Sequence, residues 1–185
     1  MKLIAITGNA GSGKTTISNI LKEKGYCVIN ADEVVHKLLQ TEEVKNFIIE
    51  AFGEQFLDRK KLSDYLFKNP TEMDKYEKFI REKVIKAINE EILKQNCEII
   101  IIDAALIFEY KLEYMFDKII CVIADEDKLI ERLKSKGYSE DTAKLILLRQ
   151  MPQKEKAKRS DIVIENNGTI EELKENVSKL ILNLI

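Results

Sequence analysis

The sequence has few of the residues on which several classes of protein depend. It contains no tryptophan, one histidine and three cysteines in 185 residues. No apolar run approaches the roughly 18 residues of a membrane span. The single histidine, His36, leaves no histidine metal cluster and no histidine-based triad. The cysteines are far apart and form no Cys-x-x-Cys pair, so we expect buried thiols in a reducing cytosol rather than disulfides or metal ligands. They are Cys27, Cys97 and Cys121.

A strong excess of charge is also missing. Thirty basic and 32 acidic residues give a net charge of −2, which provides no overall attraction to nucleic acid or to an anionic membrane. The chain begins directly with a strand-like apolar run, so we expect no signal peptide. An apolar content of 45% and a charged content of 34% are typical of a soluble globular domain. These features predict a cytoplasmic protein that binds neither nucleic acid nor membrane.

The most informative stretch is Gly8–Thr16, which reads Gly-Asn-Ala-Gly-Ser-Gly-Lys-Thr-Thr. It follows the apolar run Leu3–Ile6 and precedes apolar residues at helical spacing. A strand, a glycine-rich turn with this spacing and a helix together are typical of a phosphate-binding loop. The alternative is an ordinary glycine turn, which the complete motif and its flanking segments disfavour.

Each residue type in this loop has a chemical reason. Glycines take backbone angles that turn successive N–H groups toward one anion, and the following helix directs its positive end to the same place. Lys14 is expected to reach the β- and γ-phosphates of ATP, and the Thr15 hydroxyl to bind Mg²⁺. The predicted ATP-binding residues of the loop are Gly8, Gly11, Ser12, Gly13, Lys14, Thr15 and Thr16.

Two acidic residues follow strand-like runs. Asp32 comes after Tyr26–Ile29, and Asp103 comes after Ile99–Ile102. Open parallel sheets bind ligands at the carboxyl ends of their strands. Asp103 is therefore expected to bind Mg²⁺ directly or through water. For Asp32 two roles are open, because it could cap the next helix or act on an acceptor hydroxyl.

Five apolar runs alternate with helix-like segments, which predicts an α/β protein with a three-layer, five-stranded parallel sheet. We expect one domain over residues 1–185, with its core at about 1–32, 97–126 and 160–185. Residues 33–96 carry few strand signals and predict a helical insertion that holds the second substrate. Within the insertion, Arg81 either binds a phosphate of the acceptor or is solvated.

Residues 127–159 are predicted to form a lid. From Arg132 to Arg159 there are nine lysines and arginines against three acidic residues, around a turn at Gly137. Such cations stabilise charge on a transferring phosphoryl group, although most of the nine are expected to be solvated. Nucleic-acid binding is the rival explanation, and the net charge and the lack of interleaved aromatic residues weaken it.

Taken together, these features resemble the bacterial dephospho-coenzyme A kinases over the whole chain. The resemblance implies that ATP phosphorylates the ribose 3′-hydroxyl of dephospho-CoA, giving CoA and ADP in the last step of coenzyme A biosynthesis. It implies a catalytic role for Asp32, and it assigns Arg81, Asp103 and Phe108 to the acceptor. It places Arg132 and Arg149 in the lid, and Asn166 and Gly168 near the adenine. The resemblance rests on Thr7–Thr16, Val28–Asp32, Asp103–Glu109, Arg132, Gln150–Pro152 and Ser160–Gly168.

The chain departs from the family pattern at several positions. Where the family has His-Pro before the arginine of the long helix, this chain has Glu77 and Lys78. A carboxylate at Glu77 would repel an anionic acceptor, so another small-molecule acceptor (a nucleoside, a nucleotide or another alcohol) is the alternative. A non-enzymatic nucleotide switch is less favoured, because no Asp-x-x-Gly and no Asn-Lys-x-Asp occurs. The other departures are Ala105, Lys136 and Ile146.

Overall fold

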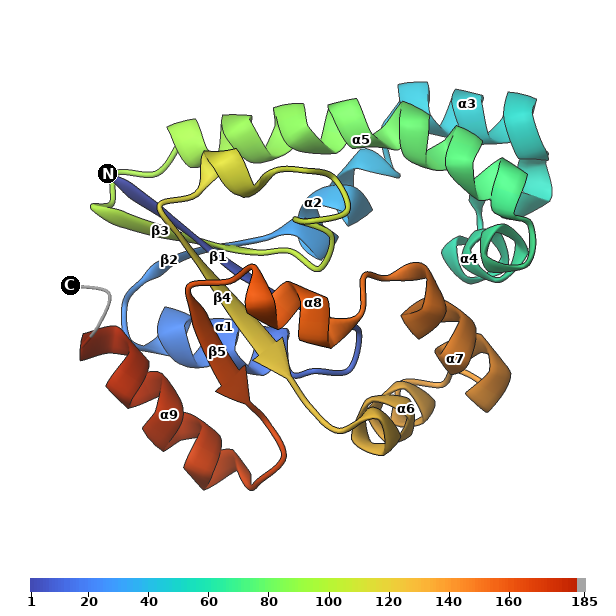
Figure 1. Ribbon diagram of the computed structural model, residues 1–185. Coiled ribbons are helices and arrows are strands. Elements are labelled where there is room, and N and C mark those ends of the chain that lie inside the picture. Colours follow the sequence, from blue (N-terminus) through green and yellow to red (C-terminus); the bar gives the residue numbers. More distant parts are fainter. Residues whose placement is uncertain (183–185) are drawn as a thin grey trace. The chain divides into compact units, whose positions relative to one another are not determined.

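Five parallel strands form one sheet with the order β2-β3-β1-β4-β5 (Figure 1). The computed structural model describes residues 1–182, with side chains through residue 180. The fold class predicted from the sequence, a five-stranded parallel α/β sheet, is confirmed. The strands are β1 (Lys2–Gly8), β2 (Cys27–Asn30), β3 (Ile99–Asp103), β4 (Lys118–Ile123) and β5 (Ile162–Glu165).

Single helices follow β1 and β5, whereas runs of several helices separate β2 from β3 and β4 from β5. They are α1 (Lys14–Glu23), α2 (Ala31–Leu38), α3 (Glu42–Phe52), α4 (Arg59–Lys68), α5 (Pro70–Leu93), α6 (Glu126–Ser135), α7 (Glu140–Arg149), α8 (Gln153–Lys158) and α9 (Ile170–Leu182). Two short 3₁₀ helices cover Glu54–Leu57 and Glu113–Met115. Among the described residues, no helix combines the length and the hydrophobicity needed to cross a membrane.

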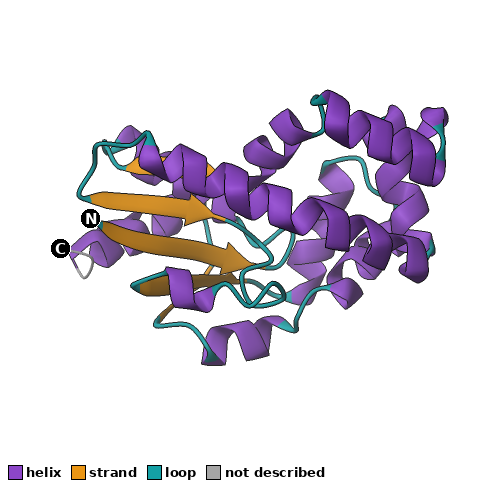
Figure 2. Ribbon diagram, turned by 90° about the horizontal axis from the view of Figure 1, so that it is seen from above, coloured by secondary structure: helices purple, strands orange, loops and turns teal. Residues whose placement is uncertain are grey.

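The chain divides into two compact units. The core unit comprises Met1–Asn30 and the chain from Gln95 onward, and the helical unit is Ala31–Lys94. The strands, drawn in orange in Figure 2, all belong to the core unit, and every element assigned between residues 31 and 94 is a helix. Within the helical unit, Phe47 of α3 and Phe79 of α5 stack with their ring centroids 3.7 Å apart. The insertion expected at about 33–96 corresponds to a unit that begins and ends two residues earlier.

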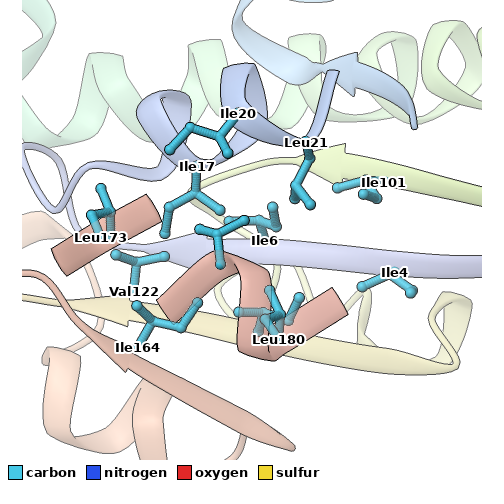
Figure 3. Packing of buried hydrophobic residues seen from close by; sticks show 12 residues of the cluster. Ile4, Ile6, Ile17, Ile20, Leu21, Ile101, Val122, Ile164, Leu173 and Leu180 are labelled. Carbon is cyan, nitrogen blue, oxygen red and sulfur yellow. The ribbon is translucent and has the colours of Figure 1, made fainter. Parts of the chain in front are cut away.

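Helices α1 and α9 cover one face of the sheet. Ile17 of α1 and Leu173 of α9 pack against Ile6 and Val122, which are inward-facing residues of β1 and β4 (Figure 3). The opposite face is covered within the core unit by α8 and by the segment after β3, where Phe108 joins a second buried cluster. Burial on both faces explains why β3 is an unbroken isoleucine run.

The start of α9 confirms a local pattern visible in the sequence. The Thr169 hydroxyl accepts a hydrogen bond from the amide of Glu172 (3.3 Å), and the Glu172 carboxylate accepts one from the amide of Thr169 (3.0 Å). This reciprocal arrangement is a capping box, which satisfies two N–H groups at the helix start. The capping box therefore marks where the Asn166–Gly168 turn ends and α9 begins.

The prediction of three free cysteines was wrong for two of them. Cys27 and Cys97 form a disulfide with their Cα atoms 6.5 Å apart. Cys27 begins β2 and Cys97 lies just before β3, and the parallel pairing of these strands brings residues 70 positions apart side by side. Cys121, in contrast, is a buried free thiol as expected. Burial raises the pKa of its thiol to about 11.

Candidate active site

The loop between β1 and α1 has the backbone that its sequence predicts. Gly8, Gly11 and Gly13 have φ angles of 145°, 82° and 101°, in the region that favours glycine. Helix α1 begins at Lys14, immediately after the last of these glycines. The side-chain oxygens of Asn9 and Ser12 are buried and have no hydrogen-bond partner among the described residues. Such groups are rare in folded proteins, and here they indicate a loop built to receive a polar ligand.

Arg132 and Asn166 hold the backbone of this loop through hydrogen bonds. The Arg132 guanidinium on α6 donates to the carbonyl oxygens of Gly11 (3.1 Å), Ser12 (3.5 Å) and Asn166 (2.9 Å). The Asn166 side chain, which is 8% exposed, donates from Nδ2 to the Ser12 carbonyl (2.8 Å). The structure thus brings Arg132 and Asn166 to a loop that lies more than 100 residues earlier in the chain. In this arrangement Arg132 holds the shape of the loop, and its predicted contact with the transferring phosphoryl group stays a prediction.

Gln150 is a loop contact that residue-by-residue reasoning missed. Its Oε1 accepts a hydrogen bond from the amide of Ala10 (2.8 Å). It directly follows Arg149, the half-buried last residue of α7. The only signal in the sequence was the family-like segment Gln150–Pro152, which did not indicate a role for the glutamine. The end of α7 is therefore attached to the phosphate-binding loop.

Lys14 lies within the loop that it was predicted to serve. Its Nζ donates to the carbonyl oxygen of Asn9 at 3.3 Å, so the ammonium is folded over the loop. Thr15 is exposed on the first turn of α1. The phosphate and metal contacts that the motif predicts for these two side chains stay predictions.

Asp103 lies at the carboxyl end of β3, in register with Ile6 of β1 and Asn30 of β2. The side chain is 4% exposed, and its Oδ2 accepts a hydrogen bond from Ser18 Oγ at 3.0 Å. Ser18 belongs to α1, one turn after Lys14, and sequence reasoning did not single it out. The carboxylate is therefore oriented by the helix that begins at the phosphate-binding loop.

Phe108 does not have the exposure that its predicted role in acceptor binding needs. The ring is 2% exposed and packs in the second core cluster with Ala5, Ile107 and Ile119. The guanidinium of Arg159 lies over it, 4.8 Å from the ring centroid. A contact with the acceptor would require the ring to leave this cluster, so Phe108 is not part of the function proposed below.

The two acceptor residues predicted in the helical unit lie on different helices. Helix α2 begins at Ala31, directly after β2, so Asp32 is exposed in the first turn and is not its N-cap. The capping alternative is therefore wrong. Arg81 is half-buried on α5, four residues after Glu77 and on the same helix face. Helix geometry therefore places Glu77 beside Arg81.

The two lid residues that depart from the family pattern lie in different environments. Lys136 is exposed at the end of α6, and Ile146 is 8% exposed on the inner side of α7. A lysine in water and an isoleucine in a small core are both ordinary environments. Gly168 lies beside the capping box of α9, where the Glu172 carboxylate occupies the space of a Cβ atom.

Gly8→Ala is expected to destabilise the protein and to weaken ATP binding. A Cβ at residue 8 would overlap the carbonyl oxygen of Val122 in β4, and its φ of 145° is strained for any side chain. Strain of this kind costs about 1–3 kcal/mol per residue. Thermal unfolding and calorimetric titration with Mg·ATP measure the two effects.

The matched control is Gly25→Ala. Gly25 also has positive φ, 90°, but a Cβ there meets no atom within 4 Å. This variant therefore carries the backbone strain without the overlap, and its ATP affinity should stay at the wild-type value. Equal melting temperatures and equal ATP affinities for both variants would contradict the geometry described for the loop.

Comparison with known proteins identifies the family. The sequence model for dephospho-CoA kinase matches residues 2–172. The chain is 34% identical over 184 residues to the dephospho-CoA kinase of Fusobacterium nucleatum, covering 96% of this chain and 95% of that protein. It is 38% identical over 190 residues to the dephospho-CoA kinase of Streptococcus agalactiae, covering 95% of each.

Solved structures share the fold of this chain. TT1252 from Thermus thermophilus superposes with a TM-score of 0.83 at 28% identity, over 100% of this chain and 98% of that chain. Dephospho-CoA kinase from Campylobacter jejuni superposes with a TM-score of 0.69 at 24% identity, over 98% and 96% of the two chains, which supports the fold. The chain thus belongs to the dephospho-CoA kinase family.

Proposed function

We propose that this protein transfers the γ-phosphoryl group of ATP to the ribose 3′-hydroxyl of dephospho-CoA, giving CoA and ADP, in the last step of coenzyme A biosynthesis in the cytoplasm. The observation that carries the proposal is the phosphate-binding loop at Gly8–Thr16, supported by Arg132 and Asn166. It occurs in a chain whose relatives named dephospho-CoA kinase align over 95% of their own length.

The loop provides the electrostatic part of the mechanism. Phosphoryl transfer passes through a loose transition state, so catalysis consists mainly of positioning and charge neutralisation. The loop amides and the Lys14 ammonium hold the β- and γ-phosphates, and Arg149 of the lid is proposed to act on the transferred group. Arg132 keeps the loop in shape through its backbone contacts. Asn166 and Gly168 are proposed to adjoin the adenine.

The helical unit provides the acceptor part. We assign Asp32 to the 3′-hydroxyl, whose oxygen attacks the γ-phosphorus while the bond to the β–γ bridging oxygen breaks. ADP leaves, and the hydroxyl proton passes to the Asp32 carboxylate. Because the transition state is loose, Asp32 acts more by orienting the hydroxyl than by removing its proton early. Arg81 is proposed to bind a phosphate of the acceptor, as arginine does with planar two-point geometry.

Mg²⁺ would neutralise charge on the ATP phosphates. Thr15 and Asp103 are the residues that would hold it, and their hydroxyl and carboxylate oxygens are the ligands that Mg²⁺ prefers. The hydrogen bond from Ser18 already orients the Asp103 carboxylate. No group of three histidine, cysteine or acidic side chains suited to a metal occurs among the described residues.

The test is ADP release from Mg·ATP with different acceptors. Dephospho-CoA, adenosine, nucleoside monophosphates and no acceptor are compared, and the product is located by phosphorus NMR. We expect turnover with dephospho-CoA alone and a phosphate on the ribose 3′-oxygen, which would make Glu77 a tolerated variation. Tight ATP binding without turnover on dephospho-CoA would overturn the proposal and direct the search to other small alcohols.

A further inference from the structure

One lysine of the lid is fully buried. Lys156, on α8, has a side-chain exposure of 0%, whereas Lys154 and Lys158 on the same short helix are exposed. From the sequence alone, Lys156 is one of nine cations in a basic segment that is expected to be mostly solvated. Burying an ammonium is costly unless hydrogen bonds and an opposite charge compensate it.

The ammonium has two short contacts. Nζ of Lys156 donates to the carbonyl oxygen of Ala105 at 2.6 Å and lies 2.8 Å from Oε1 of Glu109. Burial lowers the pKa of Lys156, and the hydrogen bond and charge of Glu109 act in the opposite direction. The other oxygen of Glu109, Oε2, is buried without a hydrogen-bond partner among the described residues. Glu109 therefore depends on Lys156 to balance its charge.

The first contact reaches the segment that carries Asp103. Ala105 is two residues after Asp103, and its carbonyl oxygen also accepts a hydrogen bond from Thr7 Oγ1 at 3.1 Å. Thr7 is fully buried and directly precedes Gly8, the first glycine of the phosphate-binding loop. The carbonyl of Ala105 is thus held between the end of β1 and the Lys156 ammonium.

The second contact reaches the end of the lid. Oε1 of Glu109 also accepts a hydrogen bond from the amide of Met151 at 2.8 Å. Met151 follows Gln150, whose side chain binds the Ala10 amide of the phosphate-binding loop at 2.8 Å. One buried ion pair therefore links the segment after Asp103 with the segment that joins α7 to the loop.

From these contacts we propose that Lys156 is a positioning residue for phosphoryl transfer, which fixes the Asp103 segment and Gln150 in one arrangement around the phosphate-binding loop. The inference rests on the proposed function. Lys156 reaches the reacting groups only through Ala105 and Glu109, so it acts on their geometry and does not contact the substrates. Small displacements of groups that position a substrate can lower the rate strongly.

Lys156→Met tests this role, with Lys158→Met as the matched control on the same helix. We expect Lys156→Met to lower kcat about 10- to 100-fold, the range for misplacing a positioned group. The Kd of Mg·ATP should stay within about threefold, because Lys14, Arg132 and Asn166 still hold the loop. Lys158→Met should retain wild-type kcat and melting temperature. A Lys156→Met protein with wild-type kcat would overturn the proposal.

A double variant separates positioning from stability. Lys156→Met combined with Glu109→Gln removes both charges and keeps an acceptor for the Met151 amide. Lys156→Met alone should lower the melting temperature, because it leaves the Glu109 carboxylate buried without its charged partner. In the double variant we expect the melting temperature to rise back toward the wild-type value, since no uncompensated carboxylate remains buried. The kcat should stay low, because the Ala105 carbonyl has lost its ammonium partner. Recovery of wild-type kcat together with the melting temperature would reduce Lys156 to a structural role.

Hydrogen exchange provides a readout that does not depend on turnover. In the absence of substrates, Lys156→Met should accelerate amide exchange in residues 104–112 and 148–153 and leave α9 unchanged. The same comparison stays available if the wild-type protein proves inactive with dephospho-CoA, so failure of the proposed function and failure of this inference give different results. The inference would be contradicted if amide exchange in both segments kept its wild-type rate in the single variant and in the double variant.

Discussion

Asp32→Asn is expected to lower kcat by about 10²–10⁴, the span of a positioned acid–base group. This loss corresponds to about 3–5 kcal/mol of activation free energy. The asparagine has the same shape but can neither accept the hydroxyl proton nor orient the hydroxyl as strongly as a carboxylate. The KM of ATP should stay near its wild-type value, because the nucleotide phosphates are assigned to the loop. Steady-state kinetics with dephospho-CoA as the varied substrate measure both constants.

Glu33→Gln is the matched control for Asp32→Asn. Glu33 is the next residue in the first turn of α2, so this change removes the same charge from the same helix end. Any effect on the helix dipole is then common to the two variants. Glu33→Gln should retain nearly full kcat. A loss below threefold in Asp32→Asn, or an equal loss in both variants, would remove Asp32 from the mechanism.

Lys14→Met should be the second most damaging change. The Lys14 ammonium is the cation within the loop, 3.3 Å from the Asn9 carbonyl, and it is expected to neutralise charge that grows on the γ-phosphoryl group. Removing one preorganised electrostatic partner costs about 10²–10³ in kcat. The affinity for Mg·ATP should also fall, because the ammonium binds the phosphates in the ground state. Calorimetric titration and ADP-release kinetics separate the two effects.

Lys22→Met, in the last turn of α1, is the control for Lys14→Met. Lys22 is exposed and lies on the same helix, so its removal changes the net charge by the same amount. We expect ATP affinity and kcat close to wild type for this variant. If Lys14→Met kept more than a third of the wild-type kcat, the loop would have to act through its amides alone.

Much of the candidate site could be predicted because its parts are local in the chain. The positive φ angles at Gly8, Gly11 and Gly13 follow from a nine-residue motif, and the capping box of α9 follows from residues three positions apart. The acidic end of β3 was also visible, because an unbroken isoleucine run predicts a strand buried on both faces. These features depend on backbone sterics and on the spacing of apolar side chains, which neighbouring residues determine.

Other features could not be predicted because they join distant segments. The guanidinium of Arg132 binds carbonyl groups about 120 positions earlier in the chain, which the sequence did not indicate, while its contact with a phosphoryl group stays a prediction. Phe108 was assigned to the acceptor, yet its ring is buried. Lys156 belongs to a basic segment that was expected to be mostly solvated, yet it is buried and forms an ion pair with Glu109. The type of a side chain indicates what it can bind, but it does not indicate which of its potential partners the folded chain places beside it.

Local conformation and hydrophobic periodicity thus encode the parallel α/β class, the position of the phosphate-binding loop and the acidic strand end, so these could be predicted from the amino-acid sequence. The strand order β2-β3-β1-β4-β5, the Cys27–Cys97 disulfide and the contacts that hold the loop emerge only in the folded chain. These depend on which distant segments the packed sheet brings together, and the entropy of closing long loops is overcome only by burial of the whole core.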